Sequence, residues 1–133
     1  MKKILLLLSV AGLITSCAND NLEELHPEVP QCDTTGVLSF ATDITPIMNL
    51  HCGTDDVGCH INPLADGGCG LANYADMMDY LVSPAKDTKF IKTVTHDPTL
   101  STSLYMPQGT TEKIDDCSIQ KSQAWIGRGK PNN

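Results

Sequence analysis

Six cysteines in a chain of 133 residues limit the ways in which this sequence can fold. Only six aromatic residues are available for the core, which is few for a domain that must be stable without cross-links. Domains of this size commonly need a disulfide, a metal or a cofactor to offset the conformational entropy lost on folding. Hydrophobic residues make up 41% of the chain and charged residues 19%, a balance typical of a globular protein. We therefore expect one small domain whose cysteines form cross-links or hold a cofactor.

A secretory signal peptide is predicted for residues 1–16. Lys2 and Lys3 precede an apolar run, Ile4 to Ile14, that is too short to span a bilayer comfortably. The run leads into Leu13-Ile14-Thr15-Ser16-Cys17, which resembles the lipobox of bacterial lipoproteins, where the cysteine is acylated and becomes the new N-terminus. This resemblance implies a lipid anchor at Cys17 that holds the chain on the periplasmic or cell-surface side of a bacterial membrane. An ordinary cleaved signal that ends near a cysteine is the alternative.

The rest of the sequence divides into a tether and a domain. Residues 17–31 are acidic, contain two prolines and show little apolar periodicity, so we interpret them as an acidic tether. Residues 32–133 form the predicted domain. The chain has a net charge of -7 and no basic stripe to neutralise phosphates, so nucleic-acid binding is not expected. No Ser/His/Asp arrangement or phosphate loop stands out, which argues against a hydrolase.

Apolar residues recur at helical spacing through the domain, and no segment shows the alternation expected of a strand. Capping and stop residues mark where the helices begin and end. Loops rich in glycine, proline and asparagine separate them. The fold class is therefore predicted to be mostly α, a small helical domain with long loops. The expected helices run from a cap at Thr42 or Asp43 to about His51, from a cap at Asn73 to Ser83-Pro84, around Phe90 to Val94, and from a cap at Asp115 or Asp116 to Gly127.

A pair of cysteines and a histidine are the candidate site residues of this sequence. Cys59-His60, with Cys52 upstream, resembles the motif by which c-type haem is attached. In that chemistry two thiols add to the haem vinyl groups as thioethers, and the adjacent imidazole becomes the proximal iron ligand. Met106-Pro107 resembles the segment that supplies the distal ligand in class I cytochromes c. A thioether in the distal position raises the reduction potential because it favours ferrous iron.

From Cys32 to Asn133 the chain resembles the small cytochrome c-like domains of bacterial exported lipoproteins. This resemblance implies a haem c held between three or more helices, with the first and last helices packed together. It implies a disulfide between Cys32 and Cys117, and a loop of that length adds about 4 to 5 kcal/mol in the chain-entropy model. It also implies a monomeric electron carrier that exchanges electrons with redox partner proteins and is not an enzyme. The blocks that carry the resemblance are Cys32-Asp33-Thr34-Thr35, Phe40 to Met48, Cys59-His60, Gly67-Gly68, Leu71 with Tyr74, Met106-Pro107 with Gly109, and Ala124-Trp125-Ile126.

One departure from the family motif leaves alternatives open. Six residues separate Cys52 from Cys59, where the family has two. The haem is then attached through two thioethers, through Cys59 alone, or not at all. In the last case Cys52 or Cys59 pairs with Cys69, and the protein is a non-redox structural or binding lipoprotein with a cytochrome-like fold. Zinc bound by Cys52, Cys59, His60 and Cys69 is a further alternative, and His51 or His96 is an alternative to Met106 on the iron.

Overall fold

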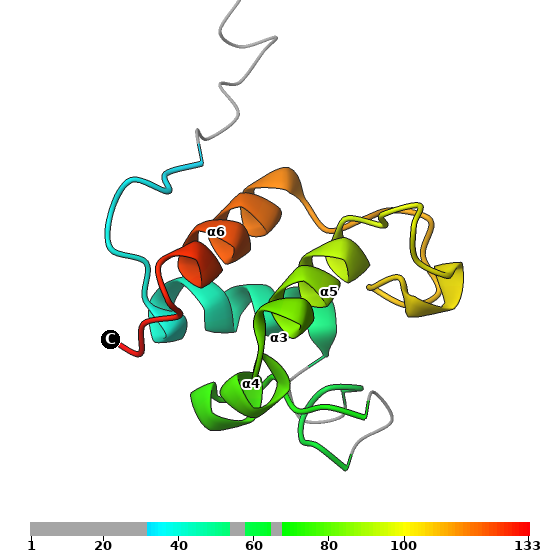
Figure 1. Ribbon diagram of the computed structural model, residues 1–133, viewed down its shortest axis with the longest axis horizontal. Helices are drawn as coiled ribbons and strands as arrows, with labels where there is room; N and C mark the ends of the chain where they lie inside the picture. Colours follow the sequence, from blue (N-terminus) through cyan, green and yellow to red (C-terminus); the bar gives the residue numbers. More distant parts are fainter. Residues whose placement is uncertain (1–31, 54–57, 65–67) are drawn as a thin grey trace, which may run out of the picture. The chain divides into compact units, whose positions relative to one another are not determined.

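Helices supply the regular structure of the domain, as the apolar spacing predicts. The computed structural model describes residues 32–53, 58–64 and 68–133; the predicted signal peptide, Cys17 and the tether lie outside the described residues. The described ranges contain four α-helices, two short helical turns and no strand (Figure 1). The prediction of a mostly α fold is confirmed. The elements are η1 (Phe40–Ile44), α3 (Thr45–Cys52), α4 (Tyr74–Tyr80), α5 (Pro84–Val94), η2 (Thr102–Leu104) and α6 (Asp116–Gly127).

The first helical segment begins earlier than its sequence predicts. Neither Thr42 nor Asp43 is the cap, because η1 begins at Phe40 and runs directly into α3. The Asp43 carboxylate instead reaches back and accepts a hydrogen bond from the backbone N–H of Ser39 at 3.0 Å. An acidic side chain inside the first turn therefore satisfies a free N–H at the start of the segment, as in a capping box. The buried side chains of this segment are Phe40, Ile44, Ile47, Met48 and Cys52.

Helix α4 starts where the sequence predicts, whereas α5 begins at Pro84, six residues before the predicted start near Phe90 and at the proline expected to stop the preceding helix. The Asn73 side chain accepts a hydrogen bond from the backbone N–H of Asp76 at 3.0 Å and caps α4. Pro84 occupies the first position of α5, where its missing N–H costs nothing. Each helix buries an apolar face, through Met77 on α4 and through Phe90 and Val94 on α5. Among the described helices, none is long and apolar enough to cross a membrane.

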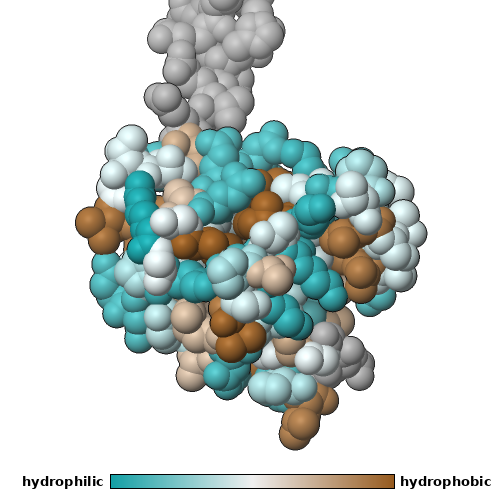
Figure 2. Space-filling model, viewed as in Figure 1, coloured by the Kyte–Doolittle hydropathy of each residue, from teal (hydrophilic) through white to brown (hydrophobic). Residues whose placement is uncertain are grey.

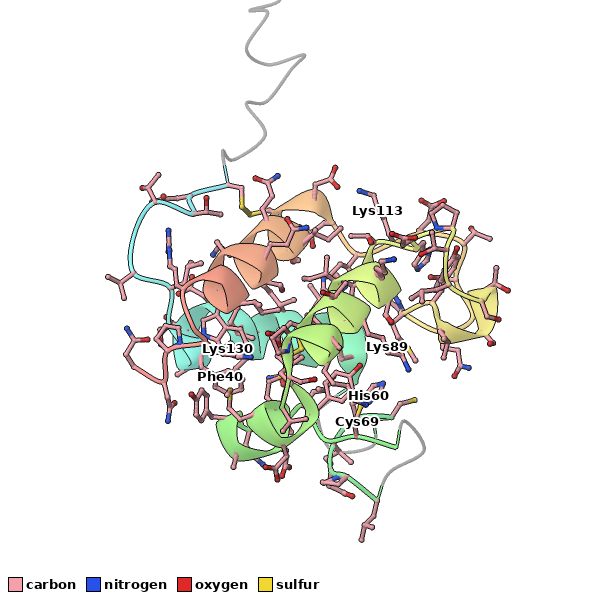
Figure 3. All side chains as sticks on the ribbon, in the orientation of Figure 1. Phe40, His60, Cys69, Lys89, Lys113 and Lys130 are labelled. Atoms are coloured by element: carbon pink, nitrogen blue, oxygen red, sulfur yellow. A yellow bond between two sulfur atoms is a disulfide. The ribbon has the colours of Figure 1, made fainter. Side chains whose placement is uncertain are left out.

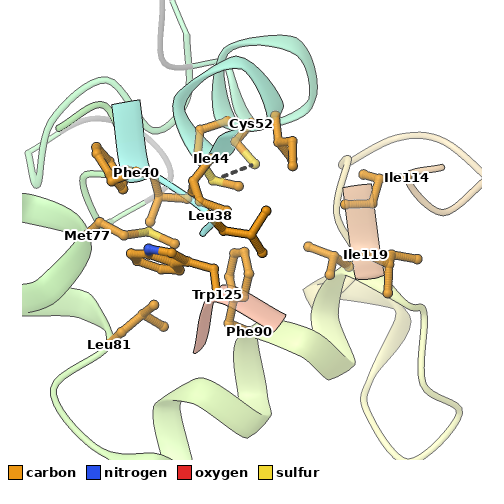
Figure 4. Packing of buried hydrophobic residues seen from close by; sticks show 14 residues of the cluster. Leu38, Phe40, Ile44, Cys52, Met77, Leu81, Phe90, Ile114, Ile119 and Trp125 are labelled. Carbon is orange, nitrogen blue, oxygen red and sulfur yellow. Dashed lines mark hydrogen bonds between the residues drawn. The ribbon is translucent and has the colours of Figure 1, made fainter. Parts of the chain in front are cut away.

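Helix α6 closes the core against the start of the domain. Its N-cap is Asp115, one of the two predicted caps. The helix contacts both η1 and α5, so the expected packing of the first and last helical segments is observed (Figure 1). Trp125 is fully buried at the centre of the core, with its ring centroid 5.7 Å from that of Phe40 (Figure 4). Its indole N–H donates to the Pro131 carbonyl at 3.0 Å, so the one polar atom of this side chain is satisfied.

A disulfide joins Cys32 to Cys117, as the family resemblance implies. The Cα atoms lie 5.2 Å apart, and the bond is drawn in yellow in Figure 3. It ties the chain before η1 to the first turn of α6. This cross-link and the packing of α6 on η1 hold the two ends of the domain together.

The residues that follow α6 contact α4, α5 and the turn between them. The Lys130 ammonium pairs with the Asp87 carboxylate at 2.9 Å and donates to the Leu81 carbonyl at 3.1 Å. The Tyr74 hydroxyl donates to the Lys130 carbonyl at 2.9 Å. Residues beyond α6 therefore contact both helices that lead toward the candidate site.

Candidate functional site

Two cavities meet at the residues that the sequence singles out. The larger, of about 280 Å³, is lined by Cys52, His60 and Met106 among others. The second, of about 240 Å³, is lined by the same three residues and by Cys59. Three separate parts of the chain, the end of α3, the loop after it and the segment after η2, thus converge on one place. The apolar side chains in the larger cavity are Leu71, Phe90, Val94 and Leu104.

The His60 ring is buried and held in one orientation. Its Nδ1 lies 3.1 Å from the Cys69 carbonyl oxygen. Because a carbonyl only accepts, Nδ1 carries the proton and Nε2 keeps its lone pair. Nε2 has no hydrogen-bond partner among the described residues. A histidine whose Nδ1 donates to a backbone carbonyl is oriented to ligate a metal through Nε2, which fits the predicted role of His60 as an iron ligand.

Two glycines bring the ends of the long cysteine spacer together. Gly53 ends α3 with a φ of 55° and is followed by residues 54–57, which lie outside the described residues. A Cβ added to Gly53 would lie 3.1 Å from the Gly58 Cα, and a Cβ added to Gly58 would overlap the Gly53 carbonyl. The His60 N–H donates to that same carbonyl at 3.2 Å. Gly53 and Gly58 are therefore neighbours in space, and Cys52 and Cys59 flank them.

The three cysteines outside the disulfide differ in their surroundings. Cys52 is buried and its Sγ lies 3.7 Å from the Met48 sulfur (Figure 4). Burial raises the pKa of the Cys52 thiol to about 12, so it is protonated at neutral pH. Cys59 is exposed, and Cys69 is half-buried with its Sγ 3.3 Å from His60 Nδ1. All three are free thiols, so the alternative bridges from Cys69 to Cys52 or Cys59 do not form here.

The zinc alternative finds no support in this geometry. Within the described ranges, no three His, Cys, Asp or Glu side chains lie together in a way that could hold a metal ion. Methionine is not among these ligand types, so the pair of His60 and Met106 stays a prediction.

Met106 is held through both of its backbone groups. Its N–H donates to the Thr93 carbonyl at the end of α5 at 3.2 Å. Its carbonyl accepts a hydrogen bond from His96 Nε2 at 3.1 Å. The His96 ring stacks on Tyr105 with ring centroids 4.5 Å apart and an interplanar angle of 9°. These contacts fix the backbone of Met106 against α5, on the wall of the cavity.

Neither alternative histidine is as well placed as Met106. His96 uses Nε2 to bind the Met106 carbonyl, so it positions this segment. His51 lines the second cavity, but its Nε2 lies 3.1 Å from the Asp115 carboxylate at the cap of α6. Both histidines therefore have partners other than a proposed iron.

The side chains of α5 that line the larger cavity were not predicted as site residues from the sequence. Besides the apolar residues, these include Lys86 and Lys89. Their spacing of three residues places both on one side of the helix, and this signal was available in the sequence.

Comparison of the chain with models of protein families, with curated proteins and with solved structures found no match.

Proposed function

We propose that this protein is a c-type electron carrier with a single haem. Cys52 and Cys59 hold the haem covalently, His60 is the proximal iron ligand and Met106 is the distal ligand. The convergence of these four side chains on two adjoining cavities supports the assignment. The lipid anchor proposed at Cys17 keeps the carrier at a bacterial membrane, where it exchanges electrons with redox partner proteins.

The contact between Gly53 and Gly58 is the observation that carries the proposal. Across this contact the residues follow one another as Cys52, Gly53, Gly58, Cys59 and His60. Two residues thus lie between the cysteines in space, which is the separation that the haem-attachment motif has in sequence. Because Gly53 and Gly58 are in contact, the six-residue spacer is compatible with two thioether bonds to one haem.

The residues of the chain would tune the haem in three ways. When bound, haem would supply an iron that is reversibly oxidised and reduced by one electron. The hydrogen bond from His60 Nδ1 to the Cys69 carbonyl makes the imidazole a stronger donor at Nε2. The Met106 thioether would favour the reduced state, and Leu71, Phe90 and Val94 would surround the haem with apolar side chains. If His60 and Met106 both held the iron, they would leave no place on it for a substrate, so the proposal is for a carrier and not an enzyme.

A glycine substitution and a deletion test this proposal. The full chain is produced in a bacterium with a working haem-attachment system, and haem that survives acid-acetone extraction is measured by absorption and mass. Gly58→Ala is expected to lower the yield of covalent haem, because the added Cβ overlaps the Gly53 carbonyl. Deleting residues 54–57 is expected to preserve the yield, because it makes the observed neighbours consecutive. Gly36→Ala is the matched control, since a Cβ there meets nothing within 4 Å.

A colourless full chain, from cells in which a known c-type cytochrome matures normally, would overturn the proposal. Mapping of the thiols without reduction then examines the alternative of a structural lipoprotein. That alternative requires a second bridge that involves Cys52 or Cys59, in addition to the bridge between Cys32 and Cys117.

A further inference from the structure

Two lysines differ from every other lysine that the structure describes. This protein is acidic, with a net charge of -7, so most cations find carboxylates nearby. Lys86 and Lys89 form no ion pair with any described residue, although Asp76 and Asp79 line a neighbouring cavity together with Lys86. Each of the remaining described lysines has an acidic partner. The pairs are Lys92 with Asp97, Lys113 with Asp116, Lys121 with Asp43 and Lys130 with Asp87.

The two unpaired lysines line the larger cavity. They lie three residues apart on α5, so they project from the same side of the helix. Lys89 lies close to His60 and Cys69 in Figure 3, and all three line this cavity. The Lys86 ammonium sits 5.4 Å from the centre of the Tyr80 ring, which also lines the cavity. Two positive charges are thus held at the edge of a mainly apolar space.

This combination selects for a particular chemical class of ligand. Leu71, Phe90 and Val94 give the cavity apolar walls, and a flat apolar ligand with two carboxylates on one edge would complement these walls and the two ammonium groups. The face shown in Figure 2 carries separate hydrophobic patches among hydrophilic residues. An unpaired cation beside an apolar cavity is stabilised most by an anion that is bound in that cavity.

We propose that Lys86 and Lys89 bind the two propionate groups of the haem and so fix its orientation in the cavity. This inference rests on the proposed function and extends it to the polar edge of the cofactor. The lysines attract the propionates as exposed ion pairs, whose contribution is modest and is weakened by salt. Each lysine is therefore expected to change haem affinity by about threefold, and both together by about tenfold.

A binding comparison between two porphyrins tests the lysines separately from the iron ligands. The full chain, purified without haem from cells that lack the attachment system, is titrated with haemin and with haemin dimethyl ester. The Soret band reports binding, and circular dichroism checks that each variant is folded. The unmodified chain is expected to bind haemin about tenfold more tightly than the ester. Lys86→Gln with Lys89→Gln removes this preference, whereas Lys113→Gln preserves it because Lys113 pairs with Asp116 away from the cavity.

The outcomes separate the two proposals. Equal affinity of the unmodified chain for haemin and its ester, or a preference that survives the double substitution, overturns the role of the lysines and leaves the proposed function standing. A folded chain that binds neither porphyrin counts against both. Where the haem-free chain does not fold, the reduction potential of the loaded protein decides. The double variant is expected to have a lower potential than the unmodified protein at low salt, and equal potentials overturn the inference.

Discussion

Met106 illustrates how a single side chain is prepared for a role by its backbone. The Thr93 carbonyl and the His96 ring bind its two peptide groups, at 3.2 and 3.1 Å, and leave the thioether to line both cavities. His60 is prepared in a comparable way, since the Cys69 carbonyl fixes its ring from the side opposite Nε2. Both proposed iron ligands are thus oriented by contacts with the main chain.

Replacing Met106 by Ala tests its role as the distal ligand. In the haem-loaded protein, we expect loss of the sulfur-to-iron charge-transfer band and a lower reduction potential, because ferrous iron loses its thioether. Absorption spectroscopy and a redox titration measure both. Met78→Ala is the control, since Met78 is a partly buried methionine of α4 that lines neither cavity. A band that persists after Met106→Ala would assign the distal position to another residue.

At the scale of the helix, α6 depends on its N-cap residue, Asp115. The Asp115 carboxylate accepts hydrogen bonds from the backbone N–H of Ser118 at 2.9 Å and from its hydroxyl at 2.6 Å. These bonds, more than the nearby His51, hold the pKa of Asp115 below its ordinary value. A carboxyl with a lowered pKa stabilises the fold above the pKa of the unfolded chain, about 3.9, and this stabilisation is lost as the pH falls.

Asp115→Ala is therefore expected to destabilise the protein by about 1 kcal/mol at pH 7, the typical cost of removing a helix cap. The loss should be smaller at pH 3, because the unmodified carboxyl is then partly protonated and has already lost part of its contribution. Urea unfolding at the two pH values measures the difference. Asp116→Ala serves for comparison, since Asp116 is exposed and pairs only with Lys113. An equal loss at both pH values would show that the charge of Asp115 does not contribute.

The helices were largely predictable because their signals are local. Asn73 and Asp115 cap α4 and α6 as expected. Pro84 was expected to stop a helix and instead begins α5, because proline is also tolerated at the first helical position. The start of the first helical segment was not predictable by the same rule, since Asp43 reaches back to Ser39 from inside the turn. The cavity was harder to predict than the helices. The neighbours Gly53 and Gly58 are five positions apart, and their contact depends on how the chain returns in space.

For the molecule as a whole, the Cys32–Cys117 disulfide closes most of the domain into one loop of 85 residues. In the chain-entropy model such a loop contributes about 4 to 5 kcal/mol, because it restricts the unfolded chain. A domain whose core has few aromatic residues depends strongly on such a cross-link for its stability.

Replacing both Cys32 and Cys117 by Ser is expected to lower the free energy of unfolding by about 4 kcal/mol. Urea unfolding followed by the fluorescence of Trp125, the one tryptophan of the chain, measures it. Cys69→Ser, which removes a half-buried thiol outside the bridge, is expected to cost far less. An unfolding midpoint that does not change in the double variant would contradict this account.

The contacts of Lys130 have a practical consequence. Its ammonium group joins Asp87 on α5 to the Leu81 carbonyl after α4, and its own carbonyl receives the Tyr74 hydroxyl. Carboxypeptidase digestion that trims the protein back to Gly129 would remove all three links and loosen the helix that bears Lys86 and Lys89. An affinity tag appended after Asn133 would lie next to the same few residues. Protein without a C-terminal tag or truncation is therefore the appropriate sample for the haem measurements.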